Sequence, residues 1–462
     1  MNKNYSYIRV VSKALCFGLV LGATALQVAS AQVGGQVATK GLTPAANTIR
    51  SYTDASIARD SEFHQPLDLL NDFYPTIEVL VSHHDNVRRR SDIEESDLKF
   101  TVSPGLAYRT NIGRHDFYAS YAGVFTFYDD LDQEESKSNA VNAHLGLDLA
   151  QDWDLRLFGG FGDGIEERGV SGSRAFNTLI IGADNGPDKF KYERYGADLA
   201  FGEKGRRLVG VLGIEKNDSR YINNFQGEAN QFGGRDREST SIHLDLSYQI
   251  GSKTAIFGRI QNTDIDYDRQ INTLDNEQDD FLVGLRWKPT NRLSGAVAVG
   301  TSDRDYDLPG RQGYDDNTYY VNLNYAFSPF ASLSVAASRI LEEPGDSESD
   351  FYESELFGLG YDHAVSERVS FNAYAKWIDD DYNTQREDKF VDFGLGVDYA
   401  FRSWLTAGLF VGDIERDSSI NELDYRDQYV GIRLRSDLRS LLRTKDEPDS
   451  ESLYSYPRVY DR

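Results

Sequence analysis

Apolar side chains recur at every second position over long stretches of this chain. Phe357, Leu359 and Tyr361 alternate with small or polar residues, and residues 369–377 repeat the pattern after a short polar break. A period of two predicts β-strands with one apolar face and one polar face. Two such strands around a tight turn predict a β-hairpin. The apolar face must then meet either a protein core or lipid.

Hairpins of this kind repeat along the second half of the chain. Their turns fall near residues 252, 290, 329, 366 and 402, a spacing of roughly 36 to 39 residues. Each unit holds two strands of about ten to fourteen residues, enough for a tilted strand to cross a membrane. We therefore predict an all-β chain that folds as a transmembrane antiparallel β-barrel of about 18 strands. In the first half, strands are expected to begin near Thr76, Leu98, His115, Asn139, Trp153, Lys189 and Arg207.

The connections between the expected strands alternate in length and composition. Short turns such as 111–113 and 251–252 alternate with longer acidic loops. Short periplasmic turns and long external loops are typical of bacterial outer-membrane barrels, whereas a soluble sandwich has no reason to sort its loops this way. We therefore expect the apolar face to meet outer-membrane lipid; a secreted all-β protein is the alternative. The acidic loops are expected at 129–135, 303–307, 342–350, 379–381 and 413–417.

The chain begins with a secretion signal pattern. The positively charged residues Lys3, Arg9 and Lys13 precede an apolar run. Ala29, Ser30 and Ala31 then form a small-residue cleavage motif. Cys16, the only cysteine, falls inside this signal, so the mature chain is expected to lack disulfides. After residue 31 there is no run of about 18 apolar residues that would predict a transmembrane helix. The expected parts are a signal peptide at 1–31, a periplasmic N-terminal segment at 32–73, the barrel at 74–438 and a charged tail at 439–462.

The net charge of −25 argues against a nucleic-acid partner. Asp264, Asp266 and Asp268 have the first spacing of an EF-hand, but Arg269 stands where the required glycine should be. We expect no metal ion and no cofactor. The acidic loops could bridge through divalent cations to lipopolysaccharide phosphates, although a solvated charged rim is the simpler interpretation.

Parity along each strand predicts which charged residues face the lumen. A barrel of about 18 strands is wide enough for an aqueous channel. Charges of both signs inside predict weak ion selectivity from the wall, and an acidic mouth favours cations or neutral solutes. The residues expected to line the pore are Arg156, Arg259, Arg286, Lys376, Arg433, Asp245 and Asp398.

No catalytic site emerges from the sequence. His83, His84 and Asp85 form the only local histidine cluster, which we interpret as a solvated loop at the top of the first strand. Neither H-E-x-x-H nor G-x-S-x-G occurs. A rim hydrolase, the third function considered, would need a serine, a histidine and a carboxylate together at the loop end of the barrel. The sequence names no such set, so we expect no enzyme.

Two short segments carry a family resemblance. Residues 74–81 (YPTIEVLV) followed by Asp85, Asn86 and Val87, and residues 102–106 (VSPGL), resemble the opening strands of an outer-membrane β-barrel porin family, porin type 2, associated with exopolysaccharide or capsule export loci. The resemblance covers roughly 74 to 438. It implies a conduit for secreted polysaccharide that works with a periplasmic export protein and has no catalytic residues. The alternative function is a general diffusion porin for small hydrophilic solutes.

Overall fold

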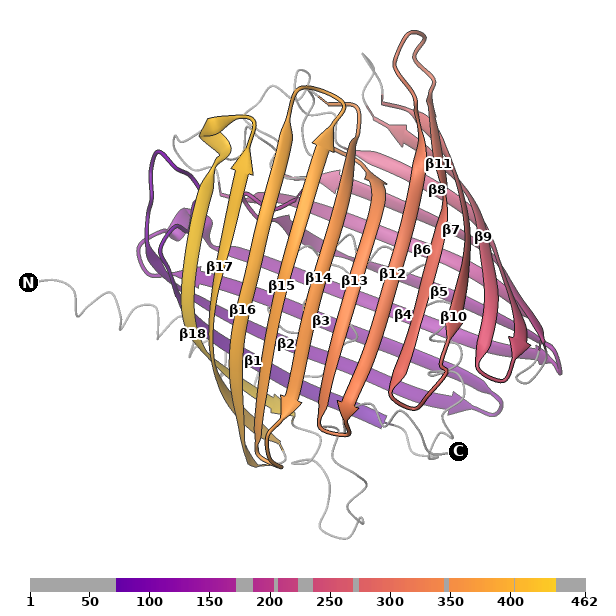
Figure 1. Ribbon diagram of the computed structural model, residues 1–462, viewed down its shortest axis with the longest axis horizontal. Helices are drawn as coiled ribbons and strands as arrows, with labels where there is room; N and C mark the ends of the chain where they lie inside the picture. Colours follow the sequence, from indigo (N-terminus) through magenta and orange to yellow (C-terminus); the bar gives the residue numbers. More distant parts are fainter. Residues whose placement is uncertain are drawn as a thin grey trace, which may run out of the picture.

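The chain forms a closed barrel of eighteen antiparallel strands, as predicted. The computed structural model describes residues 72–171, 186–202, 207–222, 236–268, 274–344, 349–402 and 404–437. Each strand pairs with its neighbours in sequence, and β1 also pairs with β18, which closes the sheet (Figure 1). The expected signal peptide, the segment before residue 72 and the charged tail lie outside the described residues.

The strands are 12 to 16 residues long, as the shortest and longest examples show. β1 starts at Asp72, two residues before the predicted start of the barrel, and β18 ends at Asp437. The strands are β1 (Asp72–His84), β2 (Asp97–Ile112), β3 (His115–Tyr128), β4 (Ser136–Ala150), β5 (Trp153–Glu166), β6 (Asp188–Phe201), β7 (Leu208–Tyr221), β8 (Arg237–Gly251), β9 (Thr254–Tyr267), β10 (Asn276–Trp287), β11 (Leu293–Tyr306), β12 (Tyr314–Ser328), β13 (Ala331–Glu342), β14 (Tyr352–Ala364), β15 (Val369–Tyr382), β16 (Glu387–Arg402), β17 (Leu405–Ser418) and β18 (Tyr425–Asp437), with short 3₁₀ turns η1 (Asp132–Glu134) and η2 (Asn421–Leu423).

Short and long connections alternate around the barrel, but three acidic segments predicted as loops lie largely within strands. β11 continues to Tyr306, β15 to Tyr382 and β17 to Ser418. These strands exceed the roughly 9 to 11 residues that a tilted strand needs to cross a bilayer. Their external ends therefore stand beyond the apolar band, where alternate carboxylates point outward into solvent and inward into the mouth.

The outer face of the barrel is apolar through its middle. Along β16, Val391, Phe393, Leu395 and Val397 are exposed, while the residues between them are buried or half-buried. The same alternation leaves Leu409 64% exposed on β17. This is the outward apolar band expected of a barrel surrounded by lipid. Among the described residues, no helix has the length and apolar character needed to cross a membrane.

The apolar band predicts a strong dependence of stability on depth. Leu395→Arg should destabilise the barrel by about 2–4 kcal/mol, because it places a charge within the hydrocarbon layer. Glu387→Arg is a matched control on the same face of β16, exposed and beyond the band, and should cost about 0–1 kcal/mol. Denaturant unfolding in lipid vesicles measures both. Equal losses for the two variants would contradict a lipid-facing exterior.

Buried apolar groups gather on the inner face of the sheet. Leu356, Ile378 and Phe390 on three consecutive strands pack with Ala336 on β13. The lumen is therefore partly filled along this wall, and further apolar clusters lie on β2 and β3 and on β11 and β12.

Candidate functional site

The inner wall carries ion pairs between neighbouring strands. Arg259 donates to Asp245 through Nε at 2.5 Å and through Nη2 at 2.6 Å, and the two residues stand directly opposite each other on β9 and β8. Arg156 on β5 faces Asp198 on β6, with its Nη2 2.5 Å from Asp198 Oδ2. Since opposite charges face each other across the ladder, each pair is neutral as a unit.

A third ion pair joins two strands that are separated by one strand between them. Arg433 on β18 donates through Nη2 to both carboxylate oxygens of Asp398 on β16, at 2.8 and 2.7 Å. Gly408 on β17 is the register partner of both residues. A Cβ at Gly408 would lie 2.0 Å from Asp398 Oδ1. The absence of a side chain at Gly408 therefore leaves room for this pair.

The structure places all seven residues predicted to line the pore on the inner side of the sheet. Lys376 Nζ donates to Asp392 Oδ2 at 3.0 Å, and the Arg286 guanidinium lies 5.2 Å from the ring centroid of Phe257. Sequence reasoning missed the partner carboxylates Asp198 and Asp392. The cross-strand register could have indicated them, because they fall on inward positions of the strands next to the predicted cations.

The ion pairs of the inner wall predict that the loss of one charge changes the ion selectivity of the channel. Asp245→Asn removes the carboxylate bound by Arg259 and should shift the permeability ratio toward anions by about a factor of two. Asp279→Asn is the matched control, because Asp279 is exposed on the outward face of β10 and should leave the ratio unchanged. Reversal potentials across planar bilayers under a salt gradient measure both. An equal shift in the two variants would contradict the lumenal assignment.

The residues that follow β5 cross the mouth of the barrel. The hydroxyl of Tyr425 on β18 donates to the carbonyl oxygen of Gly169 at 2.6 Å, and the side chain of Ser171 lies close to the hydroxyl of Tyr352 on β14. β5 and β14 stand nine strands apart in a ring of eighteen. Residues 167–171, which we name the crossing segment, therefore reach from one wall to the opposite one.

Buried and half-buried charged side chains hold the start of the crossing segment. Lys99 Nζ lies 3.4 Å from Glu167 Oε1, Arg89 Nη1 donates to the carbonyl oxygen of Arg168 at 3.0 Å, and Arg168 Nε donates to Glu134 at 3.0 Å. Burial raises the pKa of Glu167, but the charges of Lys99 and Arg89 outweigh it and leave this pKa below its ordinary value. The Glu167 carboxylate is therefore ionised at neutral pH and keeps its partners.

A second buried cluster braces the external ends of β15 to β17. Asp388 accepts hydrogen bonds from Arg386 Nε at 3.0 Å and Nη2 at 2.7 Å, from Arg416 Nη2 at 2.6 Å and from the Ser418 hydroxyl at 2.6 Å. The side chains of Asp388 and Arg416 are both 0% exposed. The Arg386 guanidinium also stacks on Tyr382, 4.1 Å from the ring centroid. One carboxylate thus compensates two buried guanidinium groups.

His84 occupies a different environment from the one predicted. His83 is exposed, but His84 closes β1 and points inward, so the interpretation of both as a solvated loop is wrong for His84. Its Nε2 lies 3.1 Å from Ser82 Oγ and its Nδ1 lies 3.0 Å from Asp427 Oδ2. Sequence reasoning missed this set because Asp427 lies 343 residues away and approaches His84 only through the pairing of β1 with β18.

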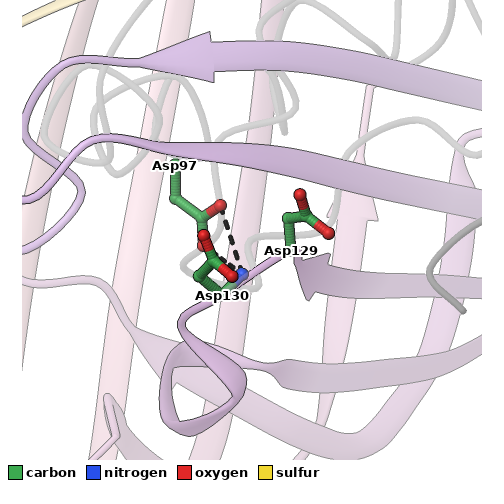
Figure 2. A group of neighbouring side chains, drawn as sticks. All are labelled: Asp97, Asp129 and Asp130. Carbon is green, nitrogen blue, oxygen red and sulfur yellow. Dashed lines mark hydrogen bonds between the residues drawn. The ribbon is translucent and has the colours of Figure 1, made fainter. Parts of the chain in front are cut away.

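Three carboxylates gather where β2 begins and β3 ends. Asp97, Asp129 and Asp130 bring oxygen atoms within 4.8 Å of one another (Figure 2). Asp97 already accepts the backbone N–H groups of Asp130 at 3.1 Å and Leu131 at 2.9 Å. These bonds fix the connection that leads into η1, so Asp97 has a loop-anchoring role, and we assign no cation here.

Comparison with protein families gives one match. The model of the family described as "Putative beta-barrel porin 2" matches residues 73–438, which is the barrel from its first strand to its last. No curated protein matches the chain.

Several solved barrels are similar in fold at low identity. OpdQ from Pseudomonas aeruginosa is 13% identical, with a TM-score of 0.44 over 80% of this chain and 100% of that one. OccK2 (OpdF) from the same organism, in complex with glucuronate, is 13% identical, with a TM-score of 0.45 over 79% and 98%. The siderophore receptor PirA from Acinetobacter baumannii is 7% identical, with a TM-score of 0.45 over 80% and 81%.

Proposed function

The chain belongs to this β-barrel porin family, and from this premise we propose that it is an outer-membrane porin through which small hydrophilic solutes diffuse. Passage of this kind needs a polar lumen and no catalysis. The neutral ion pairs of the inner wall support it, because they give a hydrated path without strong preference for either sign of charge.

The observation that carries the proposal is the crossing segment. Its contacts with Tyr425 and Tyr352 place backbone across the mouth, which divides the opening and favours small solutes over a polymer. The polysaccharide conduit that the family resemblance suggested, with its periplasmic export partner, stays a prediction. Deleting the gene and assaying surface polysaccharide tests that function separately.

The proposed surroundings follow from the outer face. Lipid tails contact the apolar band, and the exposed carboxylates on the external strand ends stand level with lipopolysaccharide headgroups. Asp303 and Asp305 on β11 and Asp381 on β15 are examples.

Solute flux tests the proposed function directly. The purified full-length chain is reconstituted into liposomes, and swelling is followed with sugars of one to six units. We expect fast swelling with monosaccharides and a steep decline with size, together with steady single-channel conductance in the absence of any partner protein. A barrel that conducts only when a periplasmic protein is added, or that passes hexasaccharides as fast as monosaccharides, would overturn the proposal.

A further inference from the structure

Ser82, His84 and Asp427 form a hydrogen-bonded chain inside the external end of the barrel. Ser82 and His84 stand two residues apart on β1, so both side chains point into the lumen. Asp427 lies on β18, the strand that closes the barrel against β1. The chain runs from Ser82 Oγ to His84 Nε2 at 3.1 Å and from His84 Nδ1 to Asp427 Oδ2 at 3.0 Å.

The identity of the acceptor fixes the direction of these bonds. An ionised carboxylate only accepts hydrogen bonds, so His84 Nδ1 carries the proton that points at Asp427. Nε2 of the neutral ring is then a free base, and the hydroxyl of Ser82 donates to it. This is the arrangement in which a serine is activated as a nucleophile by a histidine that a carboxylate orients.

The groups around His84 hold this arrangement in place. The backbone N–H of Asn86 donates to Asp427 Oδ1 at 3.4 Å, and Arg89 Nε lies 3.7 Å from Oδ2. Both contacts favour the ionised carboxylate. The His84 ring stacks on Tyr429, with centroids 5.2 Å apart and planes inclined by 24°. Stacking on Tyr429 therefore fixes one face of the imidazole, and the hydrogen bond to Asp427 fixes its Nδ1 edge.

We propose that Ser82, His84 and Asp427 hydrolyse carboxylic esters that enter the mouth of the barrel. Ser82 Oγ attacks the ester carbonyl carbon while its proton passes to His84 Nε2. The bond to the alcohol oxygen breaks, and His84 returns the proton to that leaving oxygen. Water then attacks the acyl-serine, gives a proton to Nε2, and releases the carboxylic acid as Ser82 regains its proton. This activity is independent of solute passage.

The neighbours of Ser82 indicate the class of substrate. Lys99 on β2 and Gly431 on β18 are its two register partners, so a cation, which also pairs with Glu167, stands on one side to stabilise the oxyanion, and the other side has no side chain of its own. The ring of Phe410 covers Gly431, and Ser82 is 1% exposed. Because the space beside Ser82 is filled, an ester reaches it only when the Phe410 ring moves aside, and a short acyl group, such as acetyl, on a hydrophilic alcohol that stays in the lumen requires the least movement.

The test uses the purified full-length barrel in detergent, with p-nitrophenyl acetate as substrate and a small fluorophosphonate as serine label. We expect labelling at Ser82 and a hydrolysis rate that falls about a hundredfold or more in Ser82→Ala and His84→Gln. Asp427→Asn should lower the rate as strongly, because an amide favours the wrong tautomer of His84. Ser338→Ala is the matched control, a wall serine 2% exposed, and should keep both labelling and rate.

The variant Ser82→Cys tests whether a small reagent can reach position 82, whatever the reactivity of the serine itself. Cys16, the only cysteine of the sequence, lies in the expected signal peptide, so Ser82→Cys introduces a thiol that can be followed alone. Modification of this thiol by a small methanethiosulfonate in the folded barrel is the expected result. A thiol that stays unmodified, or a wild-type barrel that takes no label, would overturn the proposal. The three residues would then only connect β1 to β18 through hydrogen bonds. Single-channel conductance of the same wild-type preparation reports separately on the proposed porin function.

Discussion

Removing the charged anchors of the crossing segment should open the channel. In the double variant Glu167→Ala and Arg168→Ala, the bonds to Lys99 and Glu134 are lost. The segment then keeps its backbone contacts and the contact of Ser171 with Tyr352, and we expect single-channel conductance to rise by about a factor of two or more as the mouth widens. Planar-bilayer recordings measure conductance, and the liposome assay measures the accompanying rise in the largest sugar that passes.

A graded series separates this effect from a general loosening of the barrel. Tyr425→Phe removes only the bond to the carbonyl of Gly169 and should raise conductance less than the double variant. Lys389→Ala removes an exposed ion pair with Glu387 on the outer face and should leave conductance unchanged. If all three variants conduct like the parent, residues 167–171 do not limit the passage of ions.

The barrel itself could be predicted from the sequence because its signals are local. Alternation along β8 and β9 sets which face each residue joins, and the turn at residues 252–253 sets their pairing. Alternation also assigned Arg259 and Asp245 to the lumen. The strand ends were missed because carboxylate-rich stretches such as residues 379–381 look like solvated loops, although they continue the same period of two.

The contacts across the mouth could not be predicted, because nothing local encodes them. Residues 167–171 carry no pattern that predicts a distant contact, yet the hydrogen bond from Tyr425 to Gly169 joins positions 256 residues apart. The same holds for His84 and Asp427. Such contacts depend on which strand closes the ring and on how far a connection folds inward, and both are properties of the assembled barrel.

The largest loss of stability should come from Asp388→Ala. Asp388 is the shared acceptor for Arg386 and Arg416, and its removal leaves two buried guanidinium groups without that carboxylate. Breaking a buried ion pair by deleting one partner costs about 3–5 kcal/mol. Denaturant unfolding in lipid vesicles measures the loss, and the temperature at which the barrel loses its folded mobility on gels gives a second reading.

The variant Arg416→Met separates the contribution of the Asp388 carboxylate from that of the Arg416 charge. Asp388 keeps both bonds from Arg386 when Arg416 is lost, so no buried carboxylate is orphaned. Moreover, Nε and Nη1 of Arg416 are buried without a hydrogen-bond partner among the described residues, and methionine removes these two unsatisfied donors while still packing against Phe390. We expect a change within about 1 kcal/mol of the parent. A loss as large as that of Asp388→Ala would mean that the cluster is stabilised by the charge of Arg416 itself rather than by the carboxylate that serves both arginines.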